Sequence, residues 1–214
     1  PDTLNGVPVT ISQVNITVVT PATPLTPGAP VPSVNPATGV ISIPANTPAG
    51  TYTITYQICE ILNPTNCDTA IVTVPVGAAA IVAQDDTMPS TIGLVGNPSL
   101  GNVLPSNGNG PDTLNGTPLA NLALVNMTVV TPATPIGAGP VPTLNTTTGL
   151  VSVPVGTPAG TYTITYQICQ ILNPTNCDTA IVTIPVTSAT IDAVNDTVAS
   201  SNGTNGNPNA GNVL

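Results

Sequence analysis

The stretch of sequence that decides the fold runs from Thr161 to Cys169 and reads TYTITYQIC. Apolar and polar side chains alternate strictly along it. The side chains expected on the buried face are Tyr162, Ile164, Tyr166 and Ile168. A period of two residues is typical of a strand with one face in a hydrophobic core, and no part of the chain shows the apolar period of a helix. We therefore predict an all-β protein.

The same nine letters stand earlier in the chain, at Thr51 to Cys59. Three further segments recur at the same offset: PDTLNG, ILNPTNCDTAIVT and GNVL begin at positions 1, 61 and 101, and again at positions 111, 171 and 211. The constant offset predicts that no residue is gained or lost between the copies. A fixed period of this length indicates one small domain repeated along the chain.

Further strands follow from the same pattern and from the spacing of Pro, Gly and Asn turns. Cys177 to Val186 is the expected neighbour of the first strand, with Ala180, Val182 and Ile184 directed inward. Shorter candidates are 122–131, 141–144, 149–153, 81–86 and 101–104. About seven short strands in roughly 110 residues predict an immunoglobulin-like β-sandwich. Gly160 and Tyr162 also resemble the tyrosine corner of such domains.

These strands place the repeat in a frame that is shifted from the ends of the chain. We expect the C-terminal part of a first immunoglobulin-like repeat in residues 1–82, a complete repeat in 83–192, and the N-terminal strands of a third repeat in 193–214. The chain starts and stops inside the repeat, so we expect it to be a window on a longer polypeptide. Tandem sandwich repeats of about 110 residues, joined in series, predict an extended rod.

The composition excludes several classes of function. Nine Asp and Glu side chains face no Lys, Arg or His, so nucleic acid is not an expected partner. The chain also lacks the usual general bases and amine nucleophiles of enzymes, and we expect no catalytic residues. Disorder is an alternative for a chain with 26 Pro and 19 Gly, but the regular alternation argues against it. The longest mildly apolar run, 72–83, is too short to span a bilayer.

Four cysteines form two equivalent pairs, because Cys59 and Cys67 recur as Cys169 and Cys177. Each pair flanks the loop between the two long strands. Following the alternation, both members of a pair fall on the outer face of the sheet, opposite each other across the hairpin. This placement predicts two disulfides, each clasping a hairpin and each stabilising it by roughly 2–3 kcal/mol. A metal site has the wrong spacing.

An Asp-Thr pair followed by an apolar residue occurs six times. This pattern resembles the acceptor motif for O-linked glycans in exported Bacteroidetes proteins. The acceptors that the resemblance implies are Thr3, Thr69, Thr87, Thr113, Thr179 and Thr197. The alternative is coincidence, because Thr is abundant and the repeat doubles each match.

Two acidic groups lie at the expected junctions between repeats. They are Asp85 with Asp86, and Asp192 with Asp196. Paired hard oxygen ligands with no cationic side chain to balance them suggest Ca²⁺, the one candidate cofactor. The alternative is that these side chains cap turns. A carboxylate pair could serve a glycosidase, but no other residue supports that activity.

Two segments carry a family resemblance. One is Val194-Asn-Asp-Thr with Gly-Asn-Val-Leu downstream, and the other is the run from Pro158 to Ala180 with its cysteine hairpin. Together they resemble the tandem immunoglobulin-like or cadherin-like repeats of giant Bacteroidetes surface proteins, SprB-type gliding-motility adhesins in particular. The resemblance implies export by the type IX system, attachment to outer-membrane motility machinery, and adhesion to an extracellular surface or polysaccharide through other regions. Residues 105–110 depart from the family pattern, which weakens a calcium site carried over from it.

Three classes of function follow. The first is a non-enzymatic extender or stalk segment of a cell-surface filament, which displays a distal adhesive region and transmits force through neighbouring repeats of the same chain. The second is a binding module, in which each repeat recognises glycan or a surface through exposed Thr and Asn side chains. The third is a subunit of a polymeric fibre or surface layer, completed by strands from neighbouring chains.

Overall fold

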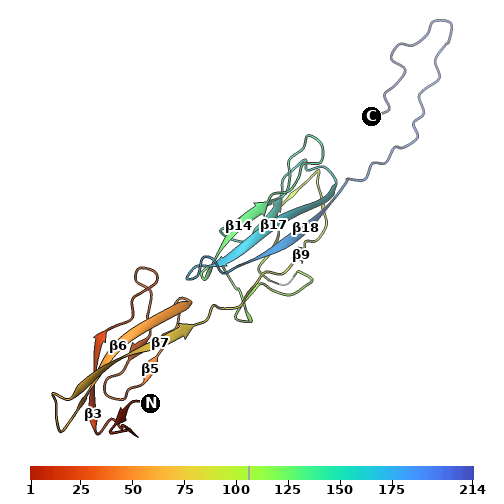
Figure 1. The fold of residues 1–214 in the computed structure, drawn as a ribbon. Coiled ribbons are helices and arrows are strands. Elements are labelled where there is room, and N and C mark those ends of the chain that lie inside the picture. Colours follow the sequence, from red (N-terminus) through yellow and green to blue (C-terminus); the bar gives the residue numbers. More distant parts are fainter. Residues whose placement is uncertain (106) are drawn as a thin grey trace.

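The computed structural model describes residues 1–105 and 107–214, and that part of the chain is built from strands without a helix. It therefore contains no helix long and apolar enough to cross a membrane. Two units follow one another end to end (Figure 1). We call residues 1–76 unit 1 and residues 81–187 unit 2. The predicted all-β class is confirmed.

The larger sheet of unit 2 is built around the two long strands that the sequence predicts. Its strands are β9 (Asp86–Thr87), β10 (Thr91–Ile92), β14 (Val125–Thr131), β17 (Gly160–Gln170) and β18 (Cys177–Thr187). Their order is β10-β18-β17-β14, with β9 also paired to β18. The long strands are antiparallel to each other, whereas β9 and β10 run parallel to β18.

Two smaller sheets complete unit 2. The order β11-β16-β15 joins β11 (Asn97–Asn102), β16 (Leu150–Val153) and β15 (Thr143–Leu144). The order β13-β12-β8 joins β13 (Thr117–Pro118), β12 (Thr113–Leu114) and β8 (Ile81–Val82). The first of these sheets shares a hydrophobic core with the larger sheet, as expected for a sandwich.

The alternating face of β17 forms the centre of that core. Tyr162, Ile164, Tyr166 and Ile168 are each at most 2% exposed, which confirms the predicted inward face. From β18, the inward residues Ala180, Val182 and Ile184 are also buried. The hydroxyl of Tyr162 donates a 2.8 Å hydrogen bond to the carbonyl of Pro158, four residues upstream. This is the bond of a tyrosine corner, and Tyr52 makes the same bond to Pro48 in unit 1.

Unit 1 repeats the later part of this plan. Its strands are β1 (Thr3–Leu4), β2 (Val7–Pro8), β3 (Val14–Thr20), β4 (Ser33–Val34), β5 (Ile41–Ser42), β6 (Gly50–Glu60) and β7 (Cys67–Val76). They form the sheets β3-β6-β7, β4-β5 and β1-β2. The described residues of unit 1 hold no counterpart of β8 to β11, so its core is smaller than that of unit 2.

The expectation that no residue is gained or lost between the copies is wrong. Val14 pairs with Glu60 in unit 1, and Val125 pairs with Gln170 in unit 2. Val14 and Val125 are therefore one position further apart in the sequence than their partners, Glu60 and Gln170. One residue is gained before the strand and one is lost in the loop after it. Surface loops accept such changes, whereas a slip within the ladder would turn the buried face outward.

Short strands account for the other differences from the expected secondary structure. The candidate 81–86 is divided, because β8 pairs with β12 while β9 pairs with β18. The expected domain boundary after residue 82 would separate β8 from the unit whose sheet it joins. The strands β10, β12 and β13 have two residues each, too few to show a period. Residues 188–214 contain no strand, and their assignment to a third repeat stays a prediction.

Candidate functional site: the junction between the units

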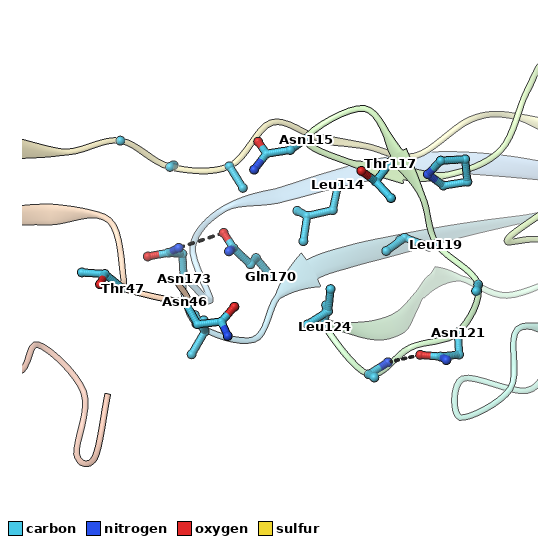
Figure 2. Close-up of a pocket in the computed structure, with 17 residues that line it drawn as sticks. Asn46, Thr47, Leu114, Asn115, Thr117, Leu119, Asn121, Leu124, Gln170 and Asn173 are labelled. Atoms are coloured by element: carbon cyan, nitrogen blue, oxygen red, sulfur yellow. Dashed lines mark hydrogen bonds between the residues drawn. The ribbon is translucent and has the colours of Figure 1, made fainter. Parts of the chain in front are cut away.

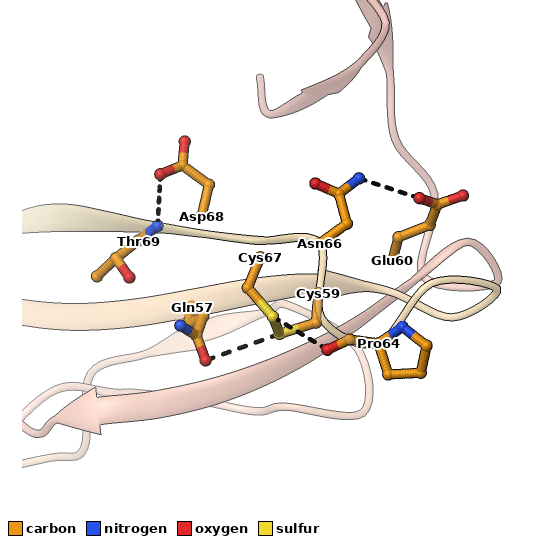
Figure 3. Close-up of a disulfide and its surroundings, with 8 residues drawn as sticks. All are labelled: Gln57, Cys59, Glu60, Pro64, Asn66, Cys67, Asp68 and Thr69. Carbon is orange, nitrogen blue, oxygen red and sulfur yellow. Dashed lines mark hydrogen bonds between the residues drawn. A yellow bond between two sulfur atoms is a disulfide. The ribbon is translucent and has the colours of Figure 1, made fainter.

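Both predicted disulfides are formed, between Cys59 and Cys67 and between Cys169 and Cys177. In each unit the two cysteines are paired directly opposite each other at the last position of the long ladder. Figure 3 shows the clasp of unit 1, where the Asn66 amide also donates a 3.0 Å hydrogen bond to Glu60. The disulfide thus closes the loop between the long strands and fixes its direction at the end of the sandwich.

The clasped loop of unit 2 contacts unit 1. The side-chain carbonyl of Asn173 accepts a 2.7 Å hydrogen bond from the backbone N–H of Ala49. Its amide nitrogen donates to Gln170 at 2.8 Å (Figure 2). The side chain is therefore held by a hydrogen bond at its oxygen and another at its nitrogen. Nearby, the amide of Asn176 donates a 2.8 Å hydrogen bond to the carbonyl of Ala79 in the linker.

The linker itself, residues 77–80, is fixed to unit 2 by a reciprocal pair of hydrogen bonds. The N–H of Ala80 donates to the side-chain carbonyl of Asn115 at 2.9 Å, and the N–H of Asn115 donates to the carbonyl of Ala80 at 2.7 Å. Asn115 adopts a left-handed backbone with φ of 50°, a conformation that Asn tolerates better than most residues. These bonds restrict the linker at the point where it enters unit 2.

A cleft of about 640 Å³ lies between the units, bordered by the linker, β12–β13 and the loop of Asn173 (Figure 2). Its lining is made of Ala, Gly, Leu, Pro, Thr, Asn and Gln side chains. None of the lining residues is acidic, a tyrosine or a cysteine. The cleft therefore offers hydrogen bonds and apolar contacts but no group suited to acid–base or metal chemistry.

Unit 2 also contains a buried acidic cluster around one tyrosine. The Tyr166 hydroxyl lies 3.2 Å from an oxygen of Asp86 and 3.2 Å from an oxygen of Asp112. Both carboxyl groups are at most 1% exposed. Asp86 also accepts from the Asn107 amide, and Asp112 accepts from the N–H of Gln84. The cluster connects β17 to the segment that opens the unit.

The electrostatics of this cluster favour bound protons. Burial raises the pKa of Asp86 from 3.8 to about 7, opposed by the hydrogen bonds from Asn107 and Tyr166, and the charges of Asp112 and Asp85 raise it further. Burial likewise raises the pKa of Asp112 to about 6, with a contribution from the charge of Asp178. A single O–H can donate to one carboxylate at a time. A proton on either carboxyl group therefore relieves the repulsion between them.

The six predicted glycan acceptors lie on several strands and not in one site. Thr3, Thr69, Thr87, Thr179 and Thr197 are exposed, whereas Thr113 is half-buried. Two of the adjacent carboxylates are engaged locally, because Asp68 and Asp178 each accept a hydrogen bond from the following Thr N–H. Glycosylation at these residues stays a prediction.

The residues predicted to bind calcium are not brought together. Asp85 accepts a hydrogen bond from the N–H of Ile181 and Asp86 belongs to the buried cluster, while Asp192 and Asp196 lie in the exposed segment after β18. No group of three or more Asp, Glu, Cys or His side chains with metal-binding geometry occurs among residues 1–105 and 107–214. For Asp85 the observed role is a hydrogen bond from a residue far along the chain, which differs from the turn cap named as the alternative. Calcium stays a prediction.

Sequence reasoning missed the junction and the acidic cluster. The junction depends on Asn173. The equivalent residue of unit 1, Asn63, is also an asparagine, but it contacts no other unit in the described part of the chain. A signal for the cluster was present: the alternation directs Tyr166 inward, and a buried tyrosine hydroxyl needs a hydrogen-bond partner. The period did not show which of the carboxylates would meet it.

Comparison with known proteins finds distant structural similarity. No protein-family model and no curated protein matches the chain. The human desmocollin-1 ectodomain aligns at 11% identity with a TM-score of 0.38, over 82% of this chain and 33% of that one. Mouse cadherin-23 repeats EC22-24 align at 15% identity with a TM-score of 0.34, over 83% of this chain and 53% of that one. The chain thus spans about a third to a half of these structures, and TM-scores of this size carry no functional argument.

The acidic cluster predicts the sign of a pH dependence. Folded unit 2 holds protons on Asp86 and Asp112 at pH values where the unfolded chain has released them. The free energy of unfolding should therefore be greatest near pH 4, fall as the pH rises to about 7, and then level off. A rise of one pKa unit corresponds to about 1.4 kcal/mol. We therefore expect the free energy of unfolding to fall by several kcal/mol over this pH range.

Denaturant-induced unfolding measured between pH 4 and pH 8 tests this fall. The transition of unit 2 is identified as the one that the core substitution Ile164→Ala moves to a lower denaturant concentration. The Asp86→Asn variant should reduce this fall, because the neutral amide neither gains nor loses a proton, and the smaller contribution of Asp112 should remain. Asp196→Asn, which removes an exposed carboxyl group, should leave the fall unchanged. Stability that rises with pH over this range would contradict the assignment.

The junction predicts that one asparagine side chain controls how the units are held. Asn173→Ala removes the acceptor for Ala49 N–H and should broaden the distribution of interunit angles without unfolding either unit. Small-angle scattering should then show a shorter mean maximum dimension. Asn63→Ala is the matched control, because it changes the same loop position in unit 1, and its scattering profile should equal that of the parent chain. Equal profiles for all three proteins would show that Asn173 does not hold the junction.

Proposed function

We propose that this chain is a non-enzymatic extender segment of a giant cell-surface adhesin filament. Its role is to hold a distal adhesive region away from the cell and to transmit force along the filament. The observation that carries the proposal is the direct bonding of consecutive units. Asn173 contacts the end of unit 1, and Asn176 and Asn115 hold the linker. An extender needs such contacts, because a free linker would let the units fold back on one another.

The outer ends of the two units support the same proposal. The junction joins Ala49 of unit 1 to Asn173 of unit 2. At the far end of unit 2, Ala159 stands at the position that corresponds to Ala49. At the start of unit 1, Asn63 corresponds to Asn173, in the same clasped loop. Each end of the pair thus carries the residue that a further repeat would meet, which suits an array in series.

The chemistry of the described residues favours a mechanical role over a catalytic one. Asp86 and Asp112 are the carboxyl groups with the most strongly raised pKa values, and they are at most 1% exposed. A substrate would have to reach a reacting group, and it cannot reach these. Lysine, arginine and histidine are absent from the whole sequence.

The strand order suits the transmission of force. Unit 2 opens with β8 and continues with β9 and β10, which are parallel neighbours of its last strand, β18. Tension on the two ends of the unit therefore slides these strands along each other. Several backbone hydrogen bonds must then break together and not one after another. The disulfide adds a covalent limit, because the loop between Cys169 and Cys177 cannot extend.

The cellular setting is part of the proposal. Two disulfides favour an oxidising compartment such as the cell exterior. Export by the type IX system, attachment to outer-membrane motility machinery and a role in gliding rest on the resemblance to SprB-type adhesins. Calcium at the predicted junction residues, if bound in the native filament, would stiffen the array.

The extender proposal predicts that reach changes in proportion to the number of units. Deleting one complete repeat from the native protein should shorten the filament by one unit and leave the other units folded, because repeats depend chiefly on their neighbours. Electron microscopy measures the length, and adhesion under flow measures the function. Graded loss of adhesion supports an extender. Abrupt loss that maps to one particular repeat would favour a binding module.

Glycosylation is a separate expectation of this setting. An exposed Thr beside Asp, such as Thr69 or Thr179, presents its hydroxyl to a modifying enzyme after export. Protein isolated from its native host should therefore have an intact mass above that of the sequence, and the extra mass should disappear from peptides in which these Thr residues are replaced by Val. An intact mass equal to that of the sequence would eliminate glycans from the proposal.

A further inference from the structure

One edge of the larger sheet of unit 2 is open. The strand at this edge is β14, which has seven residues and pairs with β17 on one side only. It is the longest edge strand in the described part of unit 2. A long open edge needs an explanation, because its free backbone groups can pair with another chain.

The hydrogen bonds between β14 and β17 show which backbone groups of β14 are used. The carbonyl of Leu124, just before β14, accepts a 3.0 Å hydrogen bond from the N–H of Ile171, just after β17. In an antiparallel ladder, every second residue directs its N–H and C=O groups to the partner strand. Counting from Leu124, Asn126 and Thr128 are therefore the residues of β14 that bond to β17.

The free backbone groups of β14 belong to Met127 and Val129, together with the carbonyl of Val125. They point away from β17, and no other strand pairs with them in the part of the chain that the structure describes. In unit 1, β3 has the same arrangement on β6, because the N–H of Ile61 donates to the carbonyl of Gln13 at 2.9 Å. Both units thus present an unpaired strand edge at the same place.

The side chains along this edge follow a pattern that is the same in both directions. Residues 125–129 read Val-Asn-Met-Thr-Val, and residues 14–18 read Val-Asn-Ile-Thr-Val. In each run, apolar residues at the two ends and the centre are separated by polar ones. A strand with this symmetry can pair with a copy of itself in antiparallel register, and every apolar side chain then lies opposite another apolar one.

The distribution of charge also favours a second copy at this edge. No charged residue occurs in 113–177, a range that contains β14 and β17, and none occurs in the counterpart range 3–59. The carboxyl groups of the larger sheet are carried by Asp86 on β9 and Asp178 on β18, away from β14. Because the chain has a net charge of -9 and no cationic side chain, two copies repel each other wherever carboxylates face carboxylates. They do not repel each other at β14.

The strand lacks the features that commonly block an open edge. Such edges usually carry a charged residue or a proline, but the first proline here is Pro132, after the end of β14. A bulge between Val129 and Thr131 interrupts the ladder only at its last step. Asn126 and Thr128 are exposed and Val129 is half-buried, so side chains on both faces of the strand can contact a partner.

We propose that β14, and in the same way β3, binds the same strand of a second copy of this chain. The two strands of type β14 pair antiparallel about a two-fold axis at Met127. Met127 then lies opposite its own copy, Val125 lies opposite Val129, and Asn126 lies opposite Thr128 on the outer face. The pairing gives partners to the free N–H and C=O groups of both edges, and the larger sheet continues from one molecule into the next.

This register keeps the apolar side chains on the side of the core. Val125 and Met127 are buried, and Val129 packs against the same core. Opposed apolar side chains on neighbouring strands stabilise a sheet. A register centred one residue later would place Val130, in the bulge, opposite Asn126 and would interrupt the new ladder.

A single pair of such short strands is a weak contact. In an array of repeats the same edge recurs in each unit, so that many weak contacts add along two filaments. Two filaments joined in this way run in opposite directions, because β14 follows the long axis of unit 2 (Figure 1). This consequence for filaments rests on the proposed extender function. The pairing itself does not, because an extender can be monomeric.

The first test removes the free N–H groups with the double variant Val18→Pro/Val129→Pro. Proline has no N–H, and an edge strand tolerates it where the N–H faces solvent, so no hydrogen bond within a unit is lost. In sedimentation velocity, the parent chain should associate as its concentration rises from micromolar to near-millimolar, whereas this variant should stay monomeric. Val18→Ile/Val129→Ile is the matched control, because it keeps the N–H groups and the apolar side chains, and it should associate as the parent chain does.

Hydrogen exchange of the parent chain, followed by NMR, tests the pairing without any substitution. The N–H groups of Met127 and Val129 should exchange more slowly as the concentration rises, because pairing gives them acceptors. Those of Asn126 and Thr128 already bond to β17 and should show no such change. In an equal mixture of isotope-labelled and unlabelled chains, contacts between Asn126 of one copy and Thr128 of the other should establish the register.

Three results would overturn the proposal. A chain that stays monomeric over the whole concentration range would do so, and it would leave the extender function intact. Assemblies that survive the double proline variant would show that another surface joins the copies. Exchange that slows equally at Asn126 and Met127, or that does not depend on concentration, would contradict pairing at this edge. If the prolines unfold a unit, the exchange pattern of the parent chain decides the question.

Discussion

The absence of any cationic side chain is the constraint on which the rest of this structure depends. Every carboxylate must be satisfied by neutral donors or by water. In unit 2 these donors are backbone N–H groups of distant segments: Ala83 donates to Asp178, Gln84 to Asp112 and Ile181 to Asp85. Asp178, on the last strand, thereby fixes the start of the unit. The acidic residues act as cross-links between the opening segment and the terminal hairpin, a role that ion pairs fill in many proteins.

The two units show how much of a sandwich depends on its opening segment. Their long strands share the sequence TYTITYQIC, yet Tyr166 is 0% exposed while Tyr56 is half-buried. The side chains and their directions are the same, so the difference comes entirely from what lies above them. The long strands alone therefore do not complete the core, because the segment that covers them in unit 2 is encoded earlier in the same repeat.

The parts of the molecule that could be predicted are those governed by a local period or by an exact match. The alternation of Tyr162 to Ile168 determined the buried face, and the placement of the cysteines across the hairpin led to the pairing of Cys169 with Cys177. The strands β8 to β13 could not be predicted reliably, because segments of two to six residues are held by tertiary contacts and turn geometry. The extra position between Val14 and Val125 was hidden by two changes in loops that cancel each other.

The interactions at the junction could not be predicted from the sequence for a different reason. Asn63 and Asn173 occupy identical loops, and only the neighbouring unit makes the second one a contact. The same holds for Asp86 and Asp112, which are far apart in the printed sequence and meet only because β9 lies on β18. Long-range pairing of this kind is a property of topology, and a periodic pattern contains no information about it.

The position of the disulfides has a consequence for recovery after mechanical unfolding. Because β6 and β17 have nearly identical sequences, β6 could pair with β18 in the same register that it uses with β7, and neighbouring repeats are prone to such exchange. The bonds Cys59–Cys67 and Cys169–Cys177 prevent it, since they keep each strand tied to its own partner while the rest of the unit is unravelled. In a chain of near-identical repeats, each disulfide therefore preserves the correct strand pairing after all other structure of the unit is lost.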